Sequence, residues 1–265
     1  MRIIQRILIT AWCLFPAAEA LPEDSSLFTE DEFLSATLIA PISRLKKQRN
    51  ADPDWLPGQF ILHDVARGDR SFEIEVTARG HFRRKRGNCS FPPYRLNFKK
   101  KEVKGTIFDG LDKVKVVSHC RETRKSFERY IFREYLAYKT LNILTEASFR
   151  VRLLNIKYVD SKGRYKPRQY AAFFIEPVEQ LAKRLDGILV TERHTLPSKF
   201  NEEALCMAEL FQFLIGNTIV PPRFVMCALP ADSRHEPDHT IWNLPGFKFR
   251  IISASVHFIK NPGSG

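Results

Sequence analysis

The sequence lacks an apolar run long enough to span a bilayer as a permanent helix, which needs roughly eighteen residues or more. The run nearest the N-terminus, Ile7 to Ala18, is shorter, and no later run reaches that length. The sequence also lacks a Cys-x-x-Cys spacing, which argues against a zinc site, and a Gly-x-Ser-x-Gly elbow, which argues against a serine hydrolase. Internal repeats and low-complexity segments are missing as well.

The short apolar run at the N-terminus is typical of a signal peptide. Arg2 and Arg6 precede it, and Ala18-Glu19-Ala20 supplies the small-x-small pattern that signal peptidase reads. We therefore expect residues 1–20 to be removed and the mature chain to be exported, to the periplasm or to the extracellular side of the cell envelope. The alternative is an N-terminal core helix.

Cysteine is scarce, with five residues in the chain. Cys13 would leave with the signal peptide, and the remaining four allow three pairings in an oxidising compartment. We predict a disulfide between Cys89 and Cys120, whose closed loop would stabilise the fold by about 3 to 4 kcal/mol. Cys206 lies in an apolar helical pattern and is interpreted as a buried thiol, with Cys227 as the fourth cysteine. Four unpaired, buried cysteines are the alternative.

Acidic residues are depleted in the middle of a chain that is otherwise ordinary for a globular protein, with 44% hydrophobic and 12% aromatic residues. The net charge is +12, and residues 79–168 hold 25 Lys and Arg against 8 Asp and Glu. The stretch 79–101 has no carboxylate at all. This asymmetry favours a surface that attracts polyanions, phosphates or an acidic polymer, although a basic run is more often a solvated face.

Alternating apolar and polar residues predict a largely antiparallel sheet, and three- and four-residue spacings predict helices, so the expected class is α+β. The expected strands are 35–42, 59–64, 71–78, 94–98, 113–118, 149–159 and 169–175, and the expected helices are 126–144, 177–185 and 201–215. Arg95, Lys113 and Lys115 alternate with apolar residues, which places cations on the wet face of the sheet. Ser126 is the expected N-cap of the first helix, and Gly216 is expected to end the last.

The domain organisation follows from these patterns. Residues 21–34 are acidic and polar and are expected to form a loose leader, and residues 35–217 are expected to form the domain. Residues 218–265 are interrupted by prolines and have little apolar periodicity, so we expect a divergent, poorly ordered tail.

The order of several motifs resembles the spore-coat-protein-H-like (CotH) kinase family over about residues 70–217. The matching segments are Arg86-Gly87-Asn88-Cys89-Ser90 with Tyr94 to Lys99 after two prolines, then Asp112 to Val117, then Phe132 to Tyr138, and finally Tyr170 to Glu176. The resemblance implies an atypical protein-kinase-like, two-lobed fold with an antiparallel N-terminal sheet and, in this chain, a truncated C-terminal helical lobe. It also implies ATP-dependent phosphorylation of a protein substrate with Mg²⁺.

The same resemblance assigns candidate nucleotide-binding residues. Lys115 or Lys100 would contact phosphates and pair with Glu134, and Glu176 would lie at the lobe junction near the adenine. Asn217 is the candidate metal ligand, and no catalytic residue is assigned.

Two of these assignments have structural alternatives. Glu134 has the alternative of a surface ion pair with Arg133 or Arg150. Glu176 has the alternative of capping the helix that starts at Pro177, where its negative charge would meet the positive end of the helix dipole.

The sequence departs from the family pattern where the catalytic loop is expected. Gly216-Asn217-Thr218 is followed by no Asp, the next carboxylate after Glu209 is Asp232, and none follows Asp238. We therefore expect the chain to be inactive, and we hypothesise a change of reading frame near residue 218, which the downstream DNA sequence would test.

The rival hypothesis is a non-catalytic module of the cell envelope that binds an acidic polymer through a cationic sheet face. The basic face carries few aromatic residues, which argues against base stacking and hence against nucleic acid as the partner. A third hypothesis is a structural protein whose charge serves solubility. Magnesium-dependent ATP binding separates the first hypothesis from the second, and the third predicts neither kind of binding.

Overall fold

The computed structural model describes residues 26–85, 87–122, 127–187, 202–216, 242–244 and 247–249. Seven strands form a closed barrel in the order β1-β2-β3-β4-β5-β7-β6. Their bounds are Leu34–Ala40 (β1), Leu56–His63 (β2), Arg70–Ala78 (β3), Tyr94–Phe98 (β4), Lys113–Val117 (β5), Val151–Asp160 (β6) and Arg168–Ile175 (β7). Every neighbouring pair is antiparallel except β1 and β6, which run parallel and close the barrel.

The barrel interior is a packed aromatic core. The alternation predicted in β3 holds, since Phe72, Ile74 and Val76 are buried in it. The ring of Phe60 packs edge-on against Phe108, with centroids 5.7 Å apart and an interplanar angle of 89°. Edge-to-face packing at this separation is favourable beyond simple burial. In the part of the chain that the structure describes, side chains therefore fill the barrel, and a functional site must lie outside it.

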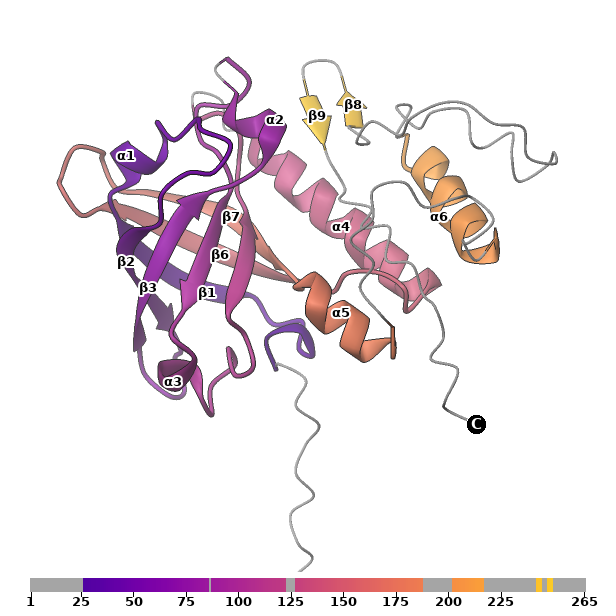
Figure 1. The fold of residues 1–265 in the computed structure, drawn as a ribbon, viewed down its shortest axis with the longest axis horizontal. Helices are drawn as coiled ribbons and strands as arrows, with labels where there is room; N and C mark the ends of the chain where they lie inside the picture. Colours follow the sequence, from indigo (N-terminus) through magenta and orange to yellow (C-terminus); the bar gives the residue numbers. More distant parts are fainter. Residues whose placement is uncertain are drawn as a thin grey trace, which may run out of the picture.

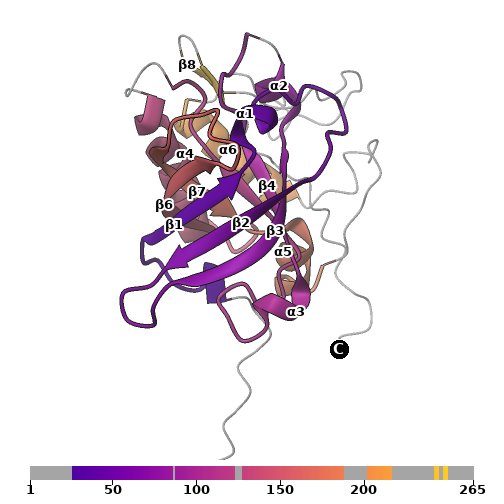
Figure 2. The ribbon, with the colours of Figure 1, turned by 90° about the vertical axis from the view of Figure 1, so that its left-hand side faces the viewer.

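The three longest helices, α4, α5 and α6, lie on one side of the barrel, whereas the short helices α1, α2 and α3 lie at its ends (Figure 1). Their bounds are Ser26–Phe28 (η1), Ile42–Leu45 (α1), His81–Arg84 (α2), Lys100–Val103 (α3), Glu128–Leu144 (α4), Val178–Arg184 (α5) and Glu202–Leu214 (α6), and a separate hairpin pairs Trp242–Leu244 (β8) with Phe247–Phe249 (β9). Figure 2 shows β1, β2 and β3 on the barrel side that faces away from α4 and α6.

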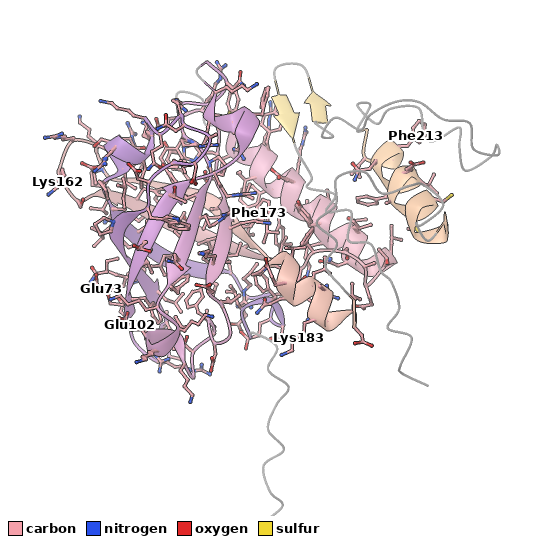
Figure 3. All side chains as sticks on the ribbon, in the orientation of Figure 1. Glu73, Glu102, Lys162, Phe173, Lys183 and Phe213 are labelled. Carbon is pink, nitrogen blue, oxygen red and sulfur yellow. A yellow bond between two sulfur atoms is a disulfide. The ribbon has the colours of Figure 1, made fainter. Side chains whose placement is uncertain are left out.

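A second apolar core joins the barrel to α4 and α5. Phe173, which lies between the barrel and α4 in Figure 3, is fully buried, and Ile131 and Tyr138 of α4 pack in the same cluster. Tyr135 and Ala137 pack against this core as well, but Leu136 is 59% exposed and Ile143 is 84% exposed. The helix therefore contacts the barrel along a narrower stripe than the sequence spacing predicted.

The predicted fold class is wrong. We expected an atypical kinase-like α+β fold with a truncated helical lobe, whereas the structure is a closed seven-stranded barrel that is mostly sheet with few helices. The reason is the pairing of β1 with β6, in which Leu34 lies opposite Leu154. An alternating pattern shows which strand face is buried, but it is the same for an open sheet and a closed one.

Several local predictions can be compared with the structure. The strand at Tyr94–Phe98 is confirmed residue for residue, and Gly216 follows α6 with the positive φ of 73° typical of a helix end. Phe127 directly precedes α4 and makes no side-chain capping bond, and the predicted N-cap, Ser126, lies outside the described residues. Within the described ranges, no helix is long and apolar enough to cross a membrane.

The predicted disulfide between Cys89 and Cys120 is present. It joins the turn after α2 to the end of β5, where the N–H groups of Ser90 and Phe91 donate to the carbonyl of Cys120 at 3.0 and 3.1 Å. Cys206 is disulfide-bonded as well, so its interpretation as a free thiol is wrong. The proposed signal peptide, residues 21–25 of the acidic leader and most of the tail lie outside the described residues.

Candidate anion site

Two cations face each other on the outer surface of the barrel. In the pairing of β4 with β5, Arg95 lies directly opposite Lys115, and Leu96 and Val114 beside them point into the core. Side chains directly opposite on antiparallel strands have Cβ atoms about 5 Å apart, and like charges in that position destabilise the sheet. The register therefore holds two positive charges together without a carboxylate between them.

Two more arginines complete a cluster at this place. Arg79 follows β3 directly, and its N–H donates to the carbonyl of Pro93 at 2.8 Å, which extends the β3–β4 pairing. Arg83 lies on α2 and donates from its guanidinium to the carbonyl of Ser118. We name Arg79, Arg83, Arg95 and Lys115 the cation cluster.

The electrostatic state of the cluster reflects crowding and burial. Burial, together with the charges of Arg79 and Arg95 and against a weaker effect of Glu179, lowers the pKa of Lys115 to about 8. Burial also lowers the pKa of Arg79 to about 10, with Arg95 and Arg83 acting in the same direction. The cations are thus held where water stabilises their charge poorly, and a bound anion would relieve this cost.

Glu134 is the buried carboxylate that faces the cluster from α4. Its side chain is 8% exposed, and its Oε2 has no hydrogen-bond partner among the described residues. Burial raises its pKa to about 7, and the charges of Arg83 and Arg79 oppose that shift. Within the described ranges no ion pair joins Glu134 to Lys115 or Lys100, so its charge balances the two arginines instead.

The proposed surface ion pair of Glu134 is wrong, because the side chain is buried. Glu176 directly precedes Pro177, the N-cap of α5, where no side-chain capping hydrogen bond is made, and its interaction with the helix dipole stays a prediction. Its carboxylate accepts hydrogen bonds from Nε and Nη2 of Arg184, at 3.1 and 3.0 Å, and from the N–H of Arg150 at 3.0 Å. With both oxygens engaged and 1% exposure, it fixes α5 to the start of β6.

The remaining predicted site residues are not brought together with the cluster. Lys100 is exposed on α3, which follows the far end of β4 and lies below the barrel in Figure 1, away from α4. Asn217 lies outside the described residues. Lys115 and Glu134 do lie in one neighbourhood, because both interact electrostatically with Arg79.

Sequence reasoning missed the arginines as individual site residues. Arg79, Arg83 and Arg95 all belong to the basic stretch that stands out in the sequence, but so do cations that lie elsewhere. The available signal was the alternation of β4 and β5, which places Arg95 and Lys115 on one face. The contribution of Arg83 depends on α2, a single turn of helix that has no periodicity to detect.

The cluster fits a phosphate group better than it fits a metal ion. Guanidinium groups bind phosphate oxygens through two parallel hydrogen bonds, and a lysine adds a point charge. Mg²⁺ needs oxygen ligands, and the described residues contain no group of three or more His, Cys, Asp or Glu side chains that could hold a metal. We therefore derive no step through Mg²⁺.

Comparison of the chain with protein-family models, with curated proteins and with solved structures gives no match. The resemblance to the CotH kinases stays a prediction, and the functional argument rests on the geometry described above.

Proposed function

We propose that the protein is an exported module that binds a compact, phosphate-bearing anion at the cation cluster. The observation that carries this proposal is the direct opposition of Arg95 and Lys115 in the β4–β5 register. Arg79 and Arg83 add further positive charge at the same place. Like charges directly opposite each other destabilise a sheet. An anion bound between Arg95 and Lys115 would remove this repulsion, which gives the arrangement a function.

A compact anion is favoured over an acidic polymer because the cations of the sheet do not form one continuous face. In the row next to Arg95 and Lys115, Asn97 pairs with Lys113, and its amide donates to Glu75 at 2.8 Å. Carboxylates thus interrupt the positive surface within one row, so an extended polyanion would meet mixed charges. Nucleoside triphosphate is the ligand that the family resemblance implies, and catalysis is not part of the proposal.

Isothermal titration calorimetry with ATP and with inorganic pyrophosphate, both without Mg²⁺, tests this function. Lys115→Met should weaken binding of both ligands about tenfold or more, since a charged hydrogen-bonding partner is lost. Lys113→Met is the matched control, because Lys113 lies on the same strand and the same face but is exposed. It should leave binding unchanged.

Dextran sulfate in the same experiment tests the rival function. Binding of the polymer, with equal losses in Lys113→Met and Lys115→Met and with neither small anion bound, would refute the compact site and support the polymer. Absence of binding by all three ligands would refute both functions.

A further inference from the structure

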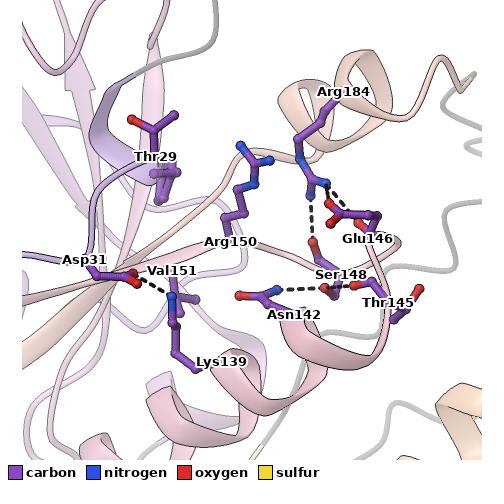
Figure 4. A pocket seen from close by; sticks show the side chains of 11 residues that line it. Thr29, Asp31, Lys139, Asn142, Thr145, Glu146, Ser148, Arg150, Val151 and Arg184 are labelled. Carbon is purple, nitrogen blue, oxygen red and sulfur yellow. Dashed lines mark hydrogen bonds and ion pairs between the residues drawn. The ribbon is translucent and has the colours of Figure 1, made fainter.

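A cavity of about 290 Å³ lies at the C-terminal end of α4, and none of its lining residues belongs to the cation cluster. Figure 4 shows its walls, which come from the segment after η1, the end of α4, the loop from Thr145 to Ser148, the start of β6 and Arg184 of α5. Only Phe28 and Val151 among its lining residues are apolar. The volume is close to the lower end of ligand pockets and equals roughly ten water molecules, enough for one small molecule.

Hydrogen bonds fix the floor of this cavity. The Arg184 guanidinium donates to the carbonyl of Ser148 at 2.8 Å and to the carbonyl of Glu146 at 2.9 Å, besides its pair with Glu176. The Asn142 amide nitrogen donates to Ser148 Oγ at 2.7 Å and to the carbonyl of Phe149 at 2.9 Å. These bonds hold the polar groups in place before a ligand arrives, which lowers the entropic cost of binding.

The fixed floor leaves hydrogen-bond acceptors available. Because the Asn142 nitrogen is occupied, its oxygen points the other way, toward the side of Lys139 (Figure 4). Asp31 uses Oδ1 for its ion pair with Lys139 at 2.5 Å, and Glu146 uses Oε2 for Arg184 at 3.3 Å. One oxygen of each of the three side chains therefore has no protein partner among the described residues, and a ligand must offer hydrogen-bond donors to use them.

The charges around the cavity determine which donors are acceptable. The lining holds three positive charges, on Lys139, Arg150 and Arg184, and two negative charges, on Asp31 and Glu146. Glu176, directly behind Arg184, completes the balance. A metal ion or an ammonium group would meet three cations nearby, whereas an anion would find Arg184 already engaged with carboxylates. Neutral O–H groups satisfy the acceptors without disturbing this balance.

We propose that this cavity binds a small, neutral, polyhydroxylated molecule of about the size of one sugar unit. The ligand presents hydroxyl donors to Asn142, Asp31 and Glu146. Its ring oxygen and remaining hydroxyls accept from the Lys139 ammonium, which has more N–H donors than its ion pair with Asp31 uses. The site shares no lining residue with the cation cluster.

Amide-resolved NMR titration of the full chain with D-glucose, N-acetyl-D-glucosamine and myo-inositol tests this proposal. At least one of the three should shift the amide resonances of residues 142–151, and 0.5 M NaCl should leave its affinity within about twofold, because a neutral ligand is not screened. The double variant Asp31→Ala/Glu146→Ala should weaken that binding about tenfold or more. Both side chains are largely exposed, at 72% and 78%, so the variant should fold.

The matched control is the double variant Asp69→Ala/Glu73→Ala, which removes two exposed carboxylates on the other side of the barrel. This control should bind the neutral molecule with the affinity of the wild type. The proposal is overturned if none of the three molecules shifts these resonances, or if the Asp31→Ala/Glu146→Ala variant binds undiminished. It is also overturned if inorganic phosphate shifts the same resonances at lower concentration than the neutral molecules, because the site would then select an anion.

Discussion

Replacing Lys115 with methionine should stabilise the free protein while removing its anion binding. Burial and two neighbouring arginines lower the pKa of Lys115 from 10.5 to about 8. A shift of one pKa unit corresponds to about 1.4 kcal/mol, so holding the charge at pH 7 costs up to about 3 kcal/mol. The side chain is partly exposed, and solvent screening reduces the expected gain in the free energy of unfolding to about 1 to 2 kcal/mol.

The pH dependence of this gain identifies its cause. Between pH 8 and 10.5 the unfolded chain binds more protons at Lys115 than the folded chain does, so the stability of the wild type rises with pH. The advantage of Lys115→Met should therefore be complete below about pH 8 and should vanish near pH 10.5. Methionine fills a similar volume without a charge, so loss of packing should not obscure the effect.

Urea denaturation followed by circular dichroism, at pH 7 and at pH 10, measures the difference. Lys113→Met is the control, because this exposed lysine should change stability by less than about 0.5 kcal/mol at either pH. The reasoning is refuted if Lys115→Met is less stable than the wild type at pH 7, or if its advantage is the same at both pH values.

Three further predictions concern neighbouring groups. Glu134→Gln should be more stable than the wild type above pH 7, by up to about 3 kcal/mol, with little difference below pH 4.5. The reason is that the pKa of Glu134 is raised to about 7 in the folded protein, so the wild type loses stability as the pH rises from 4.5 to 7. Urea denaturation across this pH range measures the difference, and a difference that does not depend on pH would contradict the prediction. Arg184→Met should lower the free energy of unfolding by about 3 to 5 kcal/mol, because it leaves the buried Glu176 without its partner. Urea denaturation measures this loss, and a loss below about 1 kcal/mol would show that the ion pair is dispensable. Cys89→Ser/Cys120→Ser should lower the free energy of unfolding by about 3 to 4 kcal/mol, as expected for a disulfide that joins residues 31 apart in the sequence. Thermal unfolding measures the loss, and an unchanged midpoint temperature would contradict the prediction.

The sequence predicted the local structure well because local structure depends on patterns within a few residues. The alternation in β4 and β5 placed Arg95 and Lys115 on one face, and the structure has them there. The pairing of Cys89 with Cys120 followed from two cysteines near strand ends in an oxidising compartment, and it is confirmed.

The barrel and the site could not be predicted because both depend on contacts between distant segments. Ala36 lies opposite Ile156 in the strand pair that closes the barrel, and no pattern within either strand specifies this partner. Glu134 was predicted to face a lysine or the surface, whereas the burial of α4 directs it toward Arg79 and Arg83. The position of that helix depends on its packing against Phe173, which only the folded structure reveals.

The central claim is that the cation cluster binds a phosphate-bearing anion, and proton uptake on binding tests it most directly. An anion beside Lys115 raises the pKa of that lysine, so pyrophosphate binding at pH 8 should take up about half a proton at this residue. Calorimetric titrations in two buffers with different ionisation enthalpies measure the uptake. The account predicts uptake by the wild type and by Lys113→Met, with a clear reduction in Lys115→Met. The same net proton uptake in all three proteins would contradict it, because the ligand's own protons contribute equally to each.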